Sequence, residues 1–221
     1  MCIGIISAMW LEIEKLHSEM KDTAEYEYAG MKYYKGTLRG KEVVLSVSGI
    51  GKVNAAIYTQ IMIDKFSPSA IIQTGIAGSM DDSAGHLSVI VSKKLTYHSV
   101  CKQLLRTSFP YSDEFAADER ITSVLLESAE DALSGLIITG DDFISDKKTK
   151  QRLKSEFPEA LCVEMEGCAV ANTAFVNGIP FAIMRCISDL SESAMSEDYA
   201  EFERLAADKA AGILLSTLEK M

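Results

Sequence analysis

Acidic residues occur at points where apolar runs of the sequence end. Four of them directly follow such runs: Glu12, Glu164, Glu166 and Asp189. Carboxyl groups can act as general acids or bases, and a neighbouring charge can tune which of the two roles each one takes. If the apolar runs are strands of one parallel sheet, their carboxyl ends meet at one edge. The spacing therefore predicts a site for carboxylate acid–base chemistry.

Each of these acids also has a purely structural explanation. Glu12 would lie in the first turn of a helix, where a carboxylate complements the helix dipole, and Asp189 could close a turn. Glu164 and Glu166 flank Met165 and cannot point the same way in an extended segment, so one can serve the backbone and the other a ligand. The acids alone leave both interpretations open.

Arg185 favours the functional interpretation. It is a cation inside the otherwise apolar run FAIMRCIS, and a buried cation requires a partner. The acids at the strand ends are the obvious candidates, and charge networks in clefts are where pKa values are tuned. A structural ion-pair network would use the same residues.

Other chemistries lack their motifs. The segments 48–52 (SGIGK) and 74–78 (TGIAG) do not have the spacing of a P-loop or of a dinucleotide-binding loop, although their glycines let a ligand approach the backbone. The three histidines match no zinc-binding spacing, and the G-x-S-x-G elbow of serine hydrolases is missing. No metal site and no serine nucleophile is predicted.

The elements that would position these residues alternate between strands and helices. Strands are predicted at 2–8, 32–38, 43–47, 69–73, 87–91, 135–139, 160–163 and 181–187. Helices are predicted at 9–20, 53–66, 121–132, 147–156, 165–177 and 199–219. Residues 74–78 are expected to end a strand, and 99–118 to form a long loop. The pattern predicts one α/β domain over residues 1–221, a three-layer sandwich whose central sheet is mixed but mostly parallel and is flanked by helices.

Composition limits the partners and the compartment. A formal net charge of −10 argues against binding to nucleic acid or to an anionic membrane. The N-terminus has no basic region and no long apolar run, and no stretch is long and apolar enough to span a membrane. The five cysteines form no C-x-x-C pair and lie mostly in apolar runs, which is typical of a reducing compartment. A cytoplasmic protein is expected.

Six segments, taken in order, resemble the nucleoside phosphorylase/nucleosidase superfamily and, within it, the methylthioadenosine/S-adenosylhomocysteine nucleosidase family. They are 3–9 (IGIISAM) with Glu12, 48–56 (SGIGKVNAA), 74–78 (TGIAG), 139–144 (TGDDFI), 157–171 (FPEALCVEMEGCAVA) and 185–189 (RCISD). Together they span nearly the whole chain. The resemblance implies hydrolysis of the N-glycosidic bond of a purine nucleoside, with release of adenine and without a metal or cofactor.

The resemblance also implies a role for individual residues. Asp189 would be the general acid toward N7 of the purine, and Glu12 would position or activate the attacking water. Glu166 would bind the ribose hydroxyls. The other residues implied in substrate binding are Met165 under the sugar, Arg185 near it, Phe143 and the Ile144 backbone at the base, Ser188 beside Asp189, and Ile50 and Ile76 in the glycine segments.

Three alternatives remain open on the sequence. A phosphorylase would need cations for phosphate, but the loop at 8–12 has no arginine and places Glu12 there, which favours water. A non-catalytic nucleoside-binding protein would have no use for a general acid. A nucleosidase for another 5′-modified adenosine stays possible, because 99–106 (SVCKQLLR) departs from the aromatic loop that shapes the 5′ pocket in the family. Homodimers are usual in that family, so a homodimer is expected.

Overall fold

The computed structural model describes residues 2–189 and 197–221, and the side chains of 189 and 197–199 are outside that description. Its strands are β1 (Cys2–Ser7), β2 (Lys21–Tyr28), β3 (Met31–Leu38), β4 (Lys41–Val47), β5 (Ala70–Ser79), β6 (Val89–Tyr97), β7 (Glu114–Ala116), β8 (Leu133–Thr139), β9 (Ala160–Glu164) and β10 (Phe181–Asp189). Its helices are α1 (Trp10–Glu19), α2 (Lys52–Phe66), α3 (Lys102–Thr107), α4 (Glu119–Ser128), α5 (Lys147–Glu156), α6 (Gly167–Val176) and α7 (Glu197–Lys220).

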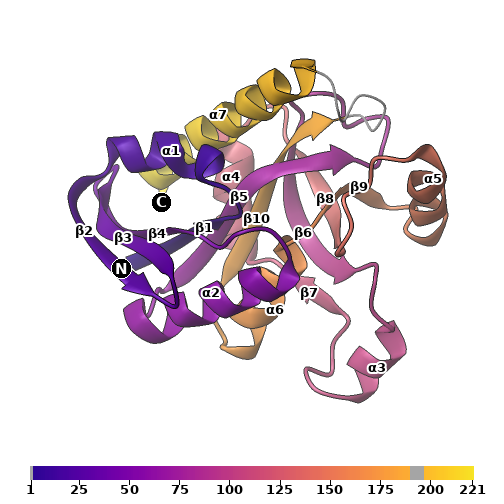
Figure 1. Ribbon diagram of the computed structural model, residues 1–221, viewed down its shortest axis with the longest axis horizontal. Helices are drawn as coiled ribbons and strands as arrows, with labels where there is room; N and C mark the ends of the chain where they lie inside the picture. Colours follow the sequence, from indigo (N-terminus) through magenta and orange to yellow (C-terminus); the bar gives the residue numbers. More distant parts are fainter. Residues whose placement is uncertain (1, 190–196) are drawn as a thin grey trace.

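All ten strands pair into one mixed sheet (Figure 1). Parallel pairs join β4, β1, β5 and β10 in one run, and β6, β8 and β9 in another. Antiparallel pairing of β10 with β6 and of β5 with β9 connects the two runs, so five strands close on themselves. The carboxyl ends of β1, β5 and β10 therefore lie at one edge.

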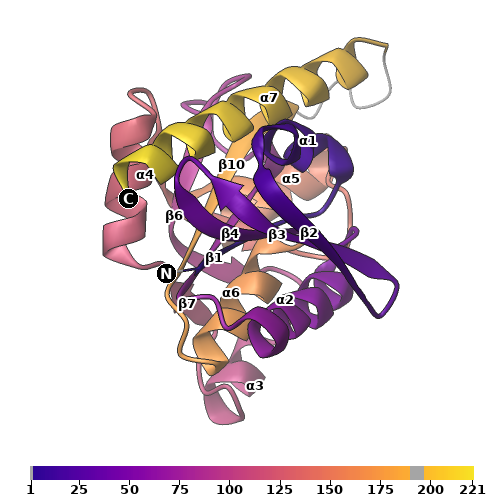
Figure 2. The ribbon, with the colours of Figure 1, turned by 90° about the vertical axis from the view of Figure 1, so that its left-hand side faces the viewer.

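Helices cover both faces of the sheet (Figure 2). Helices α1, α4 and α7 pack on one face over a core that includes Ile5, Ile72 and Met184. Helices α2 and α6 pack on the other face, over a core that includes Ile71 and Ile183. Neighbouring residues of one strand thus belong to opposite cores, as the two-residue repeat of a strand requires. The predicted α/β class with a helix-flanked mixed sheet is confirmed.

Strand β5 corrects the prediction that 74–78 ends a strand. It continues to Ser79, because β10 pairs with it along Ile71–Gly78 and β9 pairs with Gly78 and Ser79. Glycines in this segment do not break the strand. Gly75 allows charged side chains to approach the backbone of β5, as described below.

Three further elements differ from the sequence prediction. Strand β2 was not predicted, because seven of its eight residues are exposed and it lies at the edge of the sheet, where no buried face imposes an alternating pattern. The expected loop at 99–118 contains the short helix α3 and the three-residue strand β7. None of the helices that the structure describes is long and apolar enough to cross a membrane.

Candidate functional site

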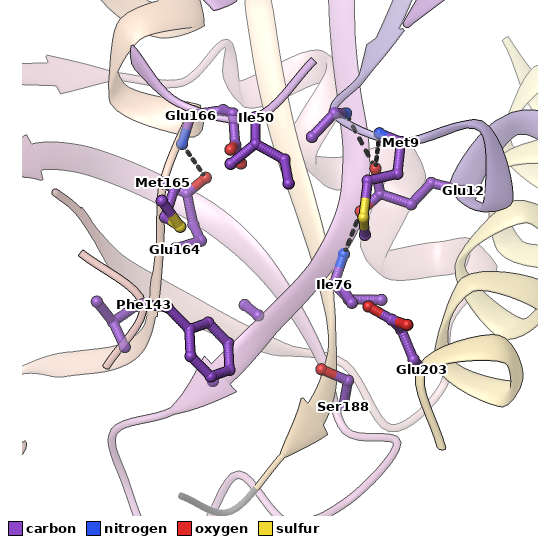
Figure 3. A pocket seen from close by; sticks show the side chains of 14 residues that line it. Met9, Glu12, Ile50, Ile76, Phe143, Glu164, Met165, Glu166, Ser188 and Glu203 are labelled. Carbon is purple, nitrogen blue, oxygen red and sulfur yellow. Dashed lines mark hydrogen bonds between the residues drawn. The ribbon is translucent and has the colours of Figure 1, made fainter. Parts of the chain in front are cut away.

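A pocket lies at the edge where β1, β5, β9 and β10 end (Figure 3). Its lining comes from seven separate parts of the chain: Ala8, Met9, Glu12, Ile50, Ile76, Ala77, Gly78, Phe143, Val163, Glu164, Met165, Glu166, Ser188 and Glu203. Acids and apolar side chains share this wall. Such a mixture suits a ligand that has both an apolar ring and hydroxyl groups.

Glu12 is held in place by backbone amides that follow β1 and by one amide within β5. It is the third residue of α1, and its Oε2 accepts hydrogen bonds from the amides of Ala8 and Met9, both at 2.9 Å. Its Oε1 accepts from the amide of Ile76 at 2.9 Å, across from β5. Burial raises its pKa, while nearby Arg185 and these amides oppose the rise. The carboxyl group is therefore fixed in position, and burial favours its neutral form.

Glu164 and Glu166 divide two tasks, as their spacing around Met165 suggested. Glu164 Oε2 accepts from the amides of Glu166 and Gly167, at 2.9 and 2.6 Å, and Oε1 accepts from Thr139 Oγ1. Glu164 thus fixes the turn that leads from β9 into α6. Glu166 accepts from the Gly51 amide at 2.8 Å and lines the pocket.

Arg185 lies beneath the pocket and connects its acids. It is fully buried, forms an ion pair with Glu164, and has Nη2 at 3.5 Å from Glu166 Oε2. Burial acts to lower its pKa, but the surrounding glutamates outweigh that effect and raise it. One buried cation thus faces three glutamates: Glu12, Glu164 and Glu166.

The pKa of Glu166 reflects this excess of negative charge. Burial and the charge of Glu164 raise its pKa to about 7, against the attraction of Arg185 and the Gly51 amide. A carboxyl group with such a pKa gains or loses a proton near neutral pH, which is common at catalytic sites.

Gly75 makes this arrangement possible. A Cβ atom at this position would overlap Arg185 Nη1 and Glu12 Oε1. The charged groups therefore pack directly against the backbone of β5. This close approach is the physical reason for a glycine inside a central strand.

The structure brings most of the predicted site residues together. Seven of them line the pocket: Glu12, Ile50, Ile76, Phe143, Met165, Glu166 and Ser188. Ile144 lines a smaller adjoining pocket that shares Phe143 and Met165 with the first. Arg185 does not line the pocket and instead contacts its acids from below. The backbone of Asp189 pairs with Gly78 after a bulge at the end of β10, but its side chain is outside the described residues.

Other lining residues were not predicted. Ala8 and Met9 could have been inferred from their position beside Glu12, and Val163 from its position before Glu164. Glu203 lies in helix α7, next to other charged residues such as Glu201 and Arg204. No local pattern distinguishes it. Among the described residues, no group of three or more potential ligands is arranged to hold a metal ion.

Comparisons with known proteins assign the chain to a family. A model of the Phosphorylase superfamily matches residues 2–219. A 5′-methylthioadenosine/S-adenosylhomocysteine nucleosidase of Staphylococcus carnosus is 38% identical over 231 aligned residues, which cover 99% of this chain and 100% of the relative.

Solved structures agree with this assignment. The 5′-methylthioadenosine/S-adenosylhomocysteine nucleosidase of S. pneumoniae, solved with a transition-state inhibitor, has a TM-score of 0.91 and 33% identity over 99% of both chains. The futalosine hydrolase of Helicobacter pylori has a TM-score of 0.90 and 28% identity, over 100% of this chain and 98% of that one. The chain belongs to the phosphorylase superfamily and, within it, to the 5′-methylthioadenosine/S-adenosylhomocysteine nucleosidases.

Proposed function

We propose that this chain hydrolyses the N-glycosidic bond of 5′-methylthioadenosine or S-adenosylhomocysteine and releases adenine. The observation that carries the proposal is that Glu12 and Glu166, which are 154 positions apart in sequence, line one pocket of a member of this family. Cleavage of a glycosidic bond needs an acid for the leaving group, negative charge near the sugar and a placed water. The site supplies acids for the second and third of these parts, and Asp189 is our candidate for the first.

The roles follow the positions of the side chains. Glu12, held by three amides and with a raised pKa, would take a proton from the attacking water. Glu166 would accept hydrogen bonds from the ribose hydroxyls, with Met165 under the sugar. Phe143, half-exposed at the pocket, would pack on the base, and the Ile144 backbone would read its edge. Asp189 would protonate N7, with Ser188 beside it, while Arg185 would hold the acids in place and Ile50 and Ile76 would line the walls.

Water suits this site better than phosphate as the nucleophile. The amides of Ala8, Met9 and Ile76 could otherwise bind an anion, but all three donate to Glu12. Arg185 is already paired with Glu164 and Glu166. A phosphate would therefore meet a carboxylate instead of free donors.

The test is base release by the wild type and by two isosteric variants, Asp189→Asn and Glu12→Gln. Each variant removes a group that transfers a proton, so we expect kcat to fall by roughly 10²–10⁴-fold while circular dichroism shows an intact fold. Near-wild-type turnover by Asp189→Asn would refute its role. Formation of ribose 1-phosphate derivatives with added phosphate would instead indicate a phosphorylase.

A panel of nucleosides separates the remaining candidates. It should include methylthioadenosine, S-adenosylhomocysteine, unmodified adenosine and futalosine, because a futalosine hydrolase shares this fold. The substrate with the highest kcat/KM identifies the 5′ group. Binding of these nucleosides without any base release would favour a non-catalytic binding protein.

We also propose that the chain forms a homodimer. Large apolar side chains are exposed on α2, α3, α6 and the segment after α3, and we call this surface the α2 face: Val53 and Ile57 of α2, Leu104 of α3, Phe109, Tyr111, and Val176 of α6. A groove between them is lined by Ile57, Phe109 and Val176 among others. Contiguous exposed apolar surface is typical of an interface, and a second copy is the partner that the family suggests.

We propose further that residues 1–221 are one domain and that the protein is cytoplasmic. A single continuous sheet supports the first statement. The second is supported by five free cysteines, three of them buried, because thiols stay reduced in the cytoplasm. Cell fractionation tests the location.

A further inference from the structure

Lys52 connects two loops that contribute to the pocket wall. It is the first residue of α2, and it follows the loop that contributes Ile50 to the lining. Its Nζ lies 2.9 Å from Oδ2 of Asp141, which stands two residues before Phe143 in the loop between β8 and α5. Ile50 and Phe143 both line the pocket (Figure 3). One ion pair therefore links two parts of the wall that are distant in sequence.

The side chain of Lys52 is held where it can make this contact. It is 16% exposed and donates a hydrogen bond to Ser99 Oγ at 2.9 Å. Its ammonium group lies 5.3 Å from the centre of the ring of Tyr97, the last residue of β6. Asp141 is 65% exposed and belongs to a loop without helix or strand. The lysine is therefore the fixed partner, and the loop of Asp141 is the part that the ion pair positions.

The place of this cation is unfavourable for α2 itself. The positive end of the helix dipole lies at the first turn of a helix and disfavours a lysine there. The first turn of α2 contains no acidic side chain, and Gly51 provides no side-chain cap. The needs of the helix thus do not explain Lys52, whereas the ion pair between the two loops does.

The loop between β8 and α5 is anchored at both ends. The amide of Gly140 donates a hydrogen bond to the carbonyl group at the end of β9 at 3.1 Å, and a Cβ atom at Gly140 would overlap the ring of His98. At the other end, the side chain of Asp146 caps α5. Phe143 lies between these anchors. The ion pair of Asp141 therefore acts where the loop has left β8 and turns toward the pocket.

We propose that Lys52 and Asp141 are positioning residues whose ion pair holds the loop of Phe143 against the loop of Ile50 and so preorganises the pocket for a neutral nucleoside. The proposal rests on the hydrolase function proposed above. Without the ion pair, the loop must be ordered when the substrate binds, and this cost weakens binding. Neither side chain lines the pocket, so the ground state and the transition state are affected equally and the change appears in KM.

The test is the KM for methylthioadenosine, which carries no net charge. Asp141→Asn removes one charge at an exposed site, and we expect it to raise KM by about 2- to 5-fold while kcat stays within about twofold. Lys52→Glu places two acids together and should raise KM by roughly 5- to 20-fold. Combining Lys52→Glu with Asp141→Lys restores an ion pair with exchanged charges. The double variant should return KM to within about twofold of the wild type.

Salt, melting temperature and a second ion pair separate this role from general stability. The difference in KM between Asp141→Asn and the wild type should narrow from about 0.05 to about 1 M NaCl, because salt screens an exposed pair. The Tm of Asp141→Asn should stay within about 3 °C of the wild type. Glu42→Gln is the matched control. It breaks the 2.7 Å ion pair with Lys35 where β4 begins, at the opposite edge of the sheet, and should leave KM unchanged.

Three results would overturn the proposal: an unchanged KM in Asp141→Asn, an equal rise in Glu42→Gln, or a folded double variant that is no better than Lys52→Glu. A wild type that binds methylthioadenosine but releases no adenine would contradict the hydrolase function. Dissociation constants from calorimetry would then still test the ion pair in the same variants. An active wild type whose variants all keep its KM would contradict this inference alone.

Discussion

Glu164 and Glu166 are two residues apart and perform different tasks. Glu164 accepts hydrogen bonds from two amides and from Thr139, and it forms the ion pair with Arg185. Glu166 makes one backbone contact, to Gly51, and retains capacity to bind a ligand. The side chain with fewer protein partners is the one available for substrate. The sequence predicted this division but could not show which acid took which task from spacing alone.

Glu166 should make stability depend on pH. Its pKa in the folded protein is raised to about 7, above the ordinary value of 4.5. The folded state therefore favours the protonated form, so this contribution is complete below about pH 4.5 and is lost as pH rises through about 7. We expect the free energy of unfolding, measured in urea from pH 5 to 8, to decline by up to roughly 3 kcal/mol.

The variant Glu166→Gln isolates this effect. Its side chain does not titrate, so the free energy of unfolding of the variant should not show the decline that Glu166 causes in the wild type between pH 5 and 8. His98, whose pKa is lowered by burial, contributes an opposite trend to both proteins and cancels in the comparison. Parallel curves for the two proteins would show that Glu166 is ionised throughout.

At the scale of the element, β5 shows where sequence reasoning failed. Two glycines in five residues at 74–78 predicted an end, yet β10 pairs with the whole segment, β9 pairs with Gly78, and the strand continues to Ser79. The local sequence shows Gly75 but not why a glycine is needed there. The need arises because Glu12 of α1 and Arg185 of β10 pack against its backbone. Most helices and buried strands could be predicted because their apolar spacing is local. The exposed strand β2 and the lining residue Glu203 could not, because their positions depend on distant parts of the chain.

Gly75→Ala tests the close packing against β5. The added methyl group would overlap the Arg185 guanidinium and the Glu12 carboxylate, so both must move. We expect a loss of roughly 1–3 kcal/mol in the free energy of unfolding and at least a tenfold loss in kcat/KM.

Gly85→Ala is the matched control for this prediction. A Cβ atom there meets nothing within 4 Å, and the backbone conformation is an ordinary one. Its stability should stay within about 0.5 kcal/mol of the wild type. Full activity in Gly75→Ala would show that the charged groups have more room than the structure indicates.

At the scale of the whole molecule, the α2 face predicts assembly. Ile57 is 46% exposed on this face and lines its groove. Replacing it by Asp would place a charge in the proposed interface, so we expect the dissociation constant of the dimer to rise by at least roughly tenfold, as measured by sedimentation equilibrium. Leu205→Asp is the control, because Leu205 is similarly exposed at 45% but lies on α7. A wild type that sediments as a monomer, or equal effects of both substitutions, would contradict the homodimer.

The glycine at position 75 also limits how this scaffold can change over evolutionary time. Because Glu12 and Arg185 pack against the bare backbone of Gly75, this part of the pocket floor admits no new side chain without displacing them. The wall of the pocket differs from its floor, since Glu203 lines it from helix α7. Descendants of this protein could therefore acquire new substrates by exchanging residues of α7, while the bond-breaking machinery below is inherited unchanged.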